Sequence, residues 1–136
     1  IRQMPKSMNL IYLLGMLDRQ AGHYESAAEC FRVVLDNRPH HLPGYLELAD
    51  VYSKVGRGND ACRVLLRAIK IAPERPGLYI RLAEQLEMKK DYSGAALVLR
   101  KGADNAGHDT CLDTYAGILK VQSQRMSNYE NAKAVG

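Results

Sequence analysis

The chain has 136 residues, of which 46% are hydrophobic and 25% charged. This balance can form a buried core, and it excludes the disordered class of protein. The net charge of +4 at pH 7 is too small by itself to indicate a nucleic-acid-binding protein. No apolar run approaches the roughly 20 residues that cross a bilayer, so no transmembrane segment is expected.

The first residue and the cysteines bear on the compartment. The chain opens at Ile1 rather than at Met, which is consistent with a fragment or a processed form. Cys30, Cys62 and Cys111 are odd in number, widely spaced, and form no C-x-x-C pair. We therefore expect the cysteines to act as small apolar residues within helices, and we expect neither a metal site nor a disulfide framework. Free thiols favour a reducing compartment such as the cytoplasm, and the periplasm is the open alternative.

Taken in chain order, apolar periodicity and glycine or proline breaks predict helices in pairs. Spacings of three and four place Tyr45, Leu48 and Tyr52 on one helical face. Glycines in residues 56–59 then break the helix, and Pro73 ends the next one. The predicted helices are Met8–Gln20, Tyr24–Asn37, Leu42–Lys54, Asn59–Ile71, Gly77–Met88, Tyr92–Asp104 and Thr110–Gln124.

The hairpin recurs with a fixed period. Pro39 and Pro73 stand 34 residues apart, and so do Ala27 and Ala61. Small residues mark two positions of each unit. They are Gly15, Ala49 and Ala83 on the first helices, and Ala27, Ala61 and Ala95 on the second helices. A larger side chain would hold the helices apart, so these positions predict close helix packing.

A unit of 34 residues with two helices resembles the tetratricopeptide repeat family. The family's Leu-Gly pair appears as Leu14-Gly15, and its Gly-x-Tyr-x-x-Ala turn runs from Gly22 to Ala27. In the third unit Lys90 stands where the turn's glycine is expected. The resemblance implies an all-α fold, a right-handed superhelical solenoid of antiparallel helix hairpins. It divides a single domain, 1–136, into repeats at 8–41, 42–75 and 76–109 with a partial fourth at 110–136.

The period slips in the fourth unit. Tyr129 and Ala132 match the Tyr-x-x-Ala of a turn, three residues later than a 34-residue step predicts. We therefore expect a helix to end near Gln124 and a turn to follow. The remaining segment, Asn128–Gly136, is too short for a full second helix.

No motif in the chain predicts chemistry. Residues 56–61 spell G-x-G-x-x-A, a form of the dinucleotide-binding pattern. That pattern needs a preceding strand, and here a predicted helix precedes it. The Walker loop, H-E-x-x-H and G-x-S-x-G are all missing from the sequence. We expect no enzyme and no cofactor.

The resemblance places a binding groove on the first helices, where the family holds a peptide. By register, twelve residues face it: Asn9, Tyr12, Met16, Arg19, Leu46, Glu47, Asp50, Ser53, Ile80, Arg81, Glu84 and Glu87. The apolar members either contact partner side chains or pack on the preceding repeat, and both interpretations stay open. The acidic members would suit a partner with Lys or Arg beside apolar anchors.

Some members of the family clamp a peptide's C-terminal carboxylate with Lys, Asn and Arg on their first helices. Here Tyr12, Met16, Glu47 and Gly77 occupy most of the corresponding positions, and only Arg81 fits. A clamp of that kind is therefore not expected.

Basic residues gather on the second helices. They are Arg63, Arg67, Lys70, Arg100 and Lys101. The first three share a helical face by spacing. They form either a solvated convex surface or a site for an acidic partner, nucleic acid or an anionic surface.

The sequence thus favours a non-catalytic scaffold that binds a peptide or protein segment in its concave groove. It would belong to a larger assembly or a longer chain, with bacterial secretion, pilus and polysaccharide-export machines as candidates. The alternative is a module that binds an acidic partner, nucleic acid or an anionic surface through its basic convex face. A homo-oligomer through the open ends of the solenoid is a further hypothesis, because an uncovered end exposes apolar surface.

Overall fold

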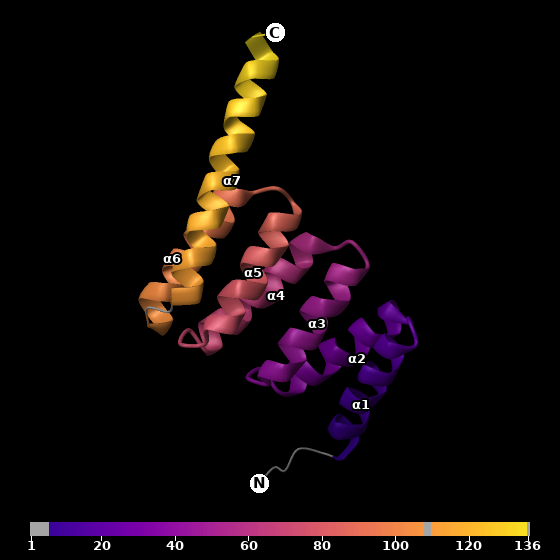
Figure 1. Cartoon of the computed structure of the whole chain (residues 1–136). Coiled ribbons are helices and arrows are strands. Elements are labelled where there is room, and N and C mark those ends of the chain that lie inside the picture. The colour runs from indigo at the N-terminus through magenta and orange to yellow at the C-terminus, as the bar shows by residue number, and fades with distance from the viewer. Residues whose placement is uncertain (1–5, 108–109, 136) are drawn as a thin grey trace. The chain divides into compact units, whose positions relative to one another are not determined.

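A computed structural model describes residues 6–107 and 110–135 of the chain. This part is helical throughout and holds no strand, so the all-α prediction is confirmed (Figure 1). The helices are α1 (Lys6–Gln20), α2 (Tyr24–Asn37), α3 (Leu42–Lys54), α4 (Gly58–Ile71), α5 (Pro76–Met88), α6 (Tyr92–Ala106) and α7 (Thr110–Val135). The first six lie within two residues of the predicted bounds.

Close contacts divide the chain into two compact units, Ile1–Ile71 and Ala72–Gly136. In the first unit α1 packs on α2, α2 on α3, and α3 on α4, which gives two successive hairpins. In the second unit α6 packs on both α5 and α7. The assignment of 1–136 to one domain stays a prediction.

Each hairpin turns at a residue with a positive φ angle. Gly22 and Gly56 have φ angles of 84° and 80°, which glycine adopts without a steric clash. Lys90 occupies the same place in the third hairpin with a φ angle of 64°. The turn therefore keeps its shape where the predicted glycine is missing, at the expense of a strained lysine backbone.

A hydrogen bond that repeats along the chain fixes the link between hairpins. The hydroxyl of Tyr45 donates to the carbonyl of Pro39 at 2.7 Å. Thirty-four residues on, the hydroxyl of Tyr79 donates to the carbonyl of Pro73 at 2.8 Å. Both tyrosines are buried, so each bond satisfies a hydroxyl that would otherwise lack water.

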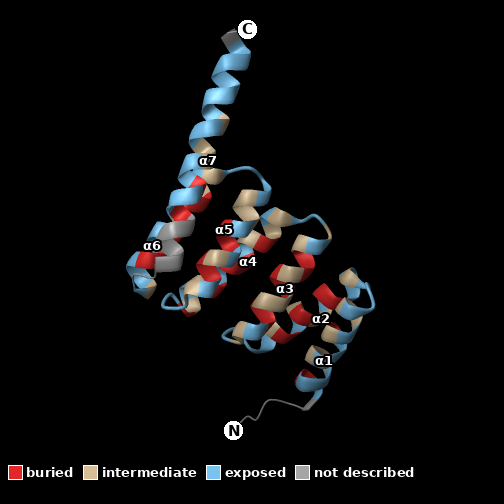
Figure 2. Cartoon of the chain, in the orientation of Figure 1, coloured by how far each residue is buried: buried red, intermediate tan, exposed pale blue. Residues whose placement is uncertain are grey.

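The small residues allow close approach of the helices, as predicted. Ala27, Ala61 and Ala95 are 0% exposed. A methyl group placed on Gly15 would lie only 2.8 Å from the ring of Phe31, so α1 and α2 need a glycine there. Buried residues follow the inner faces of the hairpins in Figure 2.

The end of α7 differs from the expectation. The predicted break between Gln124 and Asn128 is wrong, because α7 continues without interruption from Thr110 to Val135. Residues 118–135 contain neither glycine nor proline, and the serine and asparagine near the expected turn do not suffice to end a helix. The partial fourth repeat is therefore one long helix. Leu119 is fully buried, whereas Tyr129 is 63% exposed and the C-terminal turns lie in solvent (Figure 2).

Candidate functional site

An arginine joins the two first helices of the first unit. Arg19 on α1 lies 2.9 Å from Glu47 Oε1 and 3.5 Å from Asp50 Oδ2, both on α3. The contact with Glu47 is an ion pair rather than a hydrogen bond, because Arg19 Nε is buried without an aligned acceptor among the described residues. Arg19 and Glu47 are about one quarter exposed, so the pair is shielded from water in part. One negative charge of this trio remains uncompensated.

Tyr12 stands beside this trio. Its ring meets Phe31 edge-on at 5.7 Å and His41 at 5.1 Å, measured between centroids. Burial raises the pKa of the Tyr12 hydroxyl, the charge of Glu47 raises it further, and Arg19 opposes both effects. Tyr12 therefore packs within its own hairpin and on the following link, rather than standing free in the groove.

The other predicted groove residues differ in exposure. In the first unit, Met16, Leu46 and Ser53 are half-buried, and Asn9 is exposed. In the second unit, Ile80 packs against the core. On the same helix, Arg81 and Glu84 are exposed and Glu87 is half-buried. We define the α1–α3 face as Tyr12, Met16, Arg19, Leu46, Glu47 and Asp50.

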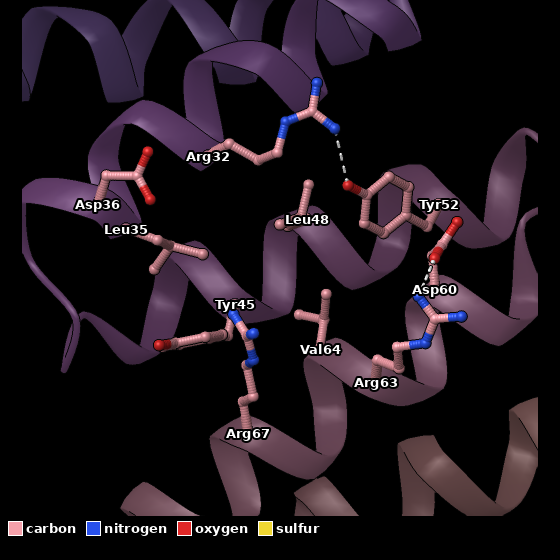
Figure 3. A pocket seen from close by; sticks show the side chains of 10 residues that line it. All are labelled: Arg32, Leu35, Asp36, Tyr45, Leu48, Tyr52, Asp60, Arg63, Val64 and Arg67. Carbon is pink, nitrogen blue, oxygen red and sulfur yellow. Dashed lines mark hydrogen bonds and ion pairs between the residues drawn. The ribbon is translucent and has the colours of Figure 1, made fainter.

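A second candidate site is a pocket of about 240 Å³ between α2, α3 and α4 (Figure 3). Leu48 and Val64 lie at its centre, with Tyr45 and Tyr52 on either side. Its remaining lining residues are Arg32, Leu35, Asp36, Asp60, Arg63 and Arg67. We call it the arginine pocket, because three guanidinium groups from two second helices surround an apolar floor.

Two of the three arginines are already paired. Arg32 donates to the hydroxyl of Tyr52 at 3.0 Å and to Glu29 at 3.0 Å. Both bonds raise the pKa of the Arg32 guanidinium, and the bond to Glu29 has the larger effect. Arg63 donates to Asp60 at 3.1 Å, and Arg57 donates to the same carboxylate at 2.8 Å. Asp60 is thus neutralised from two sides.

The third arginine and one acid lack such partners. Within residues 6–107 and 110–135, the structure gives Arg67 and Asp36 neither a hydrogen bond nor an ion pair. The pocket therefore presents a free cation on α4 and a free anion on α2 around an apolar centre. Sequence spacing pointed to Arg63 and Arg67 but missed Arg32, whose bond to Tyr52 spans 20 residues. No local pattern could have found that contact.

The five predicted basic residues do not line one pocket. Lys70 is exposed on α4 and is not part of the arginine pocket. Arg100 lines a separate cavity of about 280 Å³ between α6 and α7, together with Lys120. Lys101 is exposed and lies outside that lining.

The described residues also bear on metal binding, membrane insertion and the cysteines. Among the side chains that the structure describes, no three from His, Cys, Asp or Glu are placed to hold a metal ion. No described helix is both long and apolar enough to cross a membrane. Cys30 and Cys62 are half-buried and form no disulfide among the described residues, and the side chain of Cys111 lies outside them.

The hairpins and their repeated turns define an all-α helical-repeat protein. Residues 42–75 match the model of the tetratricopeptide repeat family. The predicted resemblance is confirmed: this stretch is one tetratricopeptide repeat, and the helices on either side fit further units of the same kind. A comparison with curated proteins gives no match.

Solved structures of other proteins share this fold. The type III secretion chaperone SycD of Yersinia enterocolitica, in complex with a peptide of the translocator YopD, is 15% identical with a TM-score of 0.70, covering 93% of this chain and 97% of that chain. The Sgt2 tetratricopeptide domain of Aspergillus fumigatus is 19% identical with a TM-score of 0.72, covering 92% and 83%. The first tetratricopeptide domain of Spaghetti, bound to an HSP90 peptide, is 14% identical with a TM-score of 0.70, covering 93% and 98%. At these identities the likeness shows the fold alone.

Proposed function

We propose that this chain is a non-catalytic scaffold that binds a peptide or protein segment along the first helices of its repeats. The observation that carries the proposal is the α1–α3 face, where Arg19 bridges Glu47 and Asp50 beside half-buried apolar side chains. The uncompensated acid favours a basic partner residue, and Met16 and Leu46 offer apolar contact next to it. The partner class is a segment with Lys or Arg adjacent to an apolar anchor.

The similar structures support this class of function. One is a chaperone with a translocator peptide, and another is a tetratricopeptide domain with an HSP90 peptide. Since function belongs to sites rather than folds, these proteins make peptide binding a reasonable expectation without naming the partner. A place in a larger assembly or longer chain is part of the proposal, with bacterial secretion, pilus and polysaccharide-export machines as the candidates.

Selection from a random peptide library displayed on phage tests the proposal. We expect peptides with Lys or Arg next to an apolar residue to be enriched on the purified chain. A selected peptide should bind the Glu47→Gln, Asp50→Asn variant on the order of tenfold more weakly. The net charge of the trio changes from −1 to +1, and each unit of charge at this partly exposed site is worth about 0.5–1 kcal/mol. Fluorescence anisotropy measures the dissociation constants.

The matched control removes two acids elsewhere. Glu25→Gln, Glu74→Gln changes exposed carboxylates outside the α1–α3 face and raises the net charge by the same two units as the test variant. It should bind the selected peptide as the parent does. Equal weakening in both double variants, or a library that yields no basic consensus, would contradict the groove as the site.

The arginine pocket favours a second candidate function, which is binding of an acidic protein segment. Arg67 is free to meet a carboxylate, and Leu48 and Val64 can hold the aliphatic part of a Glu side chain. Asp36 and Asp60 beside the arginines disfavour a phosphate backbone, so nucleic acid is not the proposed ligand. Acidic peptides in the same library should then depend on Arg67 (Arg67→Gln) and not on Lys70 (Lys70→Gln). Tight binding of a thymidine oligonucleotide with a steep salt dependence would instead support nucleic acid.

A further inference from the structure

Four leucines form an exposed row on α1. Leu10, Leu13, Leu14 and Leu17 are 65%, 52%, 51% and 56% exposed. We call this row the leucine ridge. The stretch from Ser7 to Leu17 carries no charged residue, so no polar belt interrupts the row.

The other sides of α1 are already occupied. Gly15 lies against Phe31 of α2, and Arg19 reaches α3. With a 100° turn per residue, the leucine ridge points away from Gly15, Tyr12 and Arg19. By register Leu13 corresponds to Glu47, so the ridge borders the α1–α3 face without sharing a residue with it, and the inference drawn from it does not depend on the proposed function.

The equivalent face of the next repeat shows what such a row normally contacts. Thirty-four residues on, Leu14 corresponds to Leu48, which is only 4% exposed, and Leu17 corresponds to Val51, which is 0% exposed. The helix α2 covers this face, since a methyl group on Gly44 would lie 2.9 Å from Leu35. The leucine ridge is thus a helix-packing face without its covering helix in the part of the chain described.

We propose that the leucine ridge is covered by α1 of a second copy of this chain, in an antiparallel two-fold pair. An interface around a two-fold axis must be complementary to itself. The ridge meets this requirement, because its spacing of three, one and three residues reads the same in both directions and all four side chains are leucine. In the pair, Leu10 meets Leu17 of the other copy, and Leu13 meets Leu14. Antiparallel helix dipoles also attract rather than repel.

The size of the ridge sets the strength of the pair. Four half-exposed leucines form a patch of a few hundred Å², on the order of half the roughly 800 Å² per partner of a standard stable interface. The dimer should therefore form at high concentration and dissociate on dilution.

Sedimentation velocity over a concentration series tests the proposal. The parent should shift from monomer to dimer with rising concentration. Leu13→Glu should remain monomeric throughout, because it would bury a carboxylate near the two-fold axis. Leu66→Glu is the matched control, since Leu66 is also about half exposed (50%) on a helix but lies outside the ridge. A parent that stays monomeric, or a dimer that survives Leu13→Glu, overturns the proposal.

Cysteine cross-linking tests the antiparallel arrangement. A mixture of Leu10→Cys and Leu17→Cys chains should form a disulfide between residues 10 and 17, which peptide mapping by mass spectrometry identifies. Leu10→Cys alone should give far less 10-to-10 product, because the two residues lie at opposite ends of the paired helices. Preferential 10-to-10 linkage would show a parallel pair, and ladders of higher oligomers would show a head-to-tail contact. Either result overturns the proposed geometry.

Discussion

Lys90 is the one described residue other than glycine with a positive φ angle, and its backbone is strained for that reason. A side chain in the left-handed region destabilises the folded state by about 1–2 kcal/mol, and a glycine would remove this strain. Because glycine also has more freedom in the unfolded chain, about 0.5–1 kcal/mol of the gain is lost. We expect Lys90→Gly to raise the free energy of unfolding by about 0.5–1 kcal/mol. Urea denaturation followed by circular dichroism measures the change.

The reverse change at an equivalent turn provides the control. Gly56 has a φ angle of 80° and open space where a side chain would stand. Gly56→Ala should therefore lower the stability by about 0.5–1 kcal/mol, because the reduced freedom of the unfolded chain offsets part of the backbone strain. If Lys90→Gly destabilises the chain, the lysine side chain contributes more than its backbone costs.

His41 makes the stability of the first unit depend on pH. Its Nδ1 accepts a hydrogen bond from the amide of Gly44 at 3.1 Å, and its ring lies against Tyr12. Burial, and then the charge of Arg38, lower the pKa of His41 from its ordinary value of 6.5. The folded state therefore favours the neutral imidazole. Its stabilisation is complete above pH 6.5 and is lost as the pH falls through the lowered pKa.

We expect the parent to unfold at a lower urea concentration at pH 5.5 than at pH 7.5. In His41→Asn, which keeps a capping acceptor without a titrating ring, this difference should shrink. His40→Asn changes an exposed neighbour and should retain the parent's pH dependence. An unchanged pH dependence in His41→Asn would show that other groups cause it.

At the scale of helices, paired residue sizes set the distance between α1 and α2. The first repeat combines Gly15 with Phe31, whereas the second repeat has Ala49 and Leu65 at the same positions. A methyl group on Gly15 would press against the Phe31 ring. Gly15→Ala should therefore lower the stability by about 1–2 kcal/mol, after the gain in helix propensity is subtracted from the overpacking.

The double variant Gly15→Ala, Phe31→Leu gives the first repeat the pair found in the second. It should be more stable than the sum of the two single changes predicts, by about 1 kcal/mol or more. A double-mutant cycle from urea denaturation measures this coupling. Additive effects would mean that the two positions do not share the packing space that the structure places between them.

At the scale of the whole molecule, the leucine ridge links folding to association. If the native state dimerises and the unfolded chain does not, mass action raises the melting temperature with protein concentration. We expect a measurable rise over a hundredfold concentration range for the parent and none for Leu13→Glu. Differential scanning calorimetry measures both. An equal rise in the two proteins would assign the effect to association elsewhere on the chain.

Much of the fold could be predicted from the sequence because the repeat is a local pattern. The period of 34, the turn glycines and the small residues all act over a few turns of helix, and six helices lie close to their expected bounds. The prediction was wrong in α7. Tyr129 and Ala132 match two residues of the turn motif, but no residue near them ends the helix. A motif of two residues is too weak to override continuous helix propensity.

The candidate sites were only partly predictable. Register placed Arg19, Glu47 and Asp50 on first helices, but their ion pairing depends on how closely α1 and α3 approach. The five basic residues on the second helices likewise do not share a pocket, because Arg63 and Arg67 line one pocket, Arg100 lines another, and two lysines line neither.

The sequence by itself determined the repeat, its hairpins and the positions where helices approach closely, because each follows from local spacing and side-chain size. Only the tertiary structure decided that Arg32 bonds to Tyr52, that Arg67 has no hydrogen bond or ion pair within the described residues, and that Leu14 is half exposed where Leu48 is buried. Those outcomes depend on contacts between residues far apart in the chain. They also depend on which helix faces are covered in the described part of the chain, and a periodic sequence places similar residues on covered and on exposed faces.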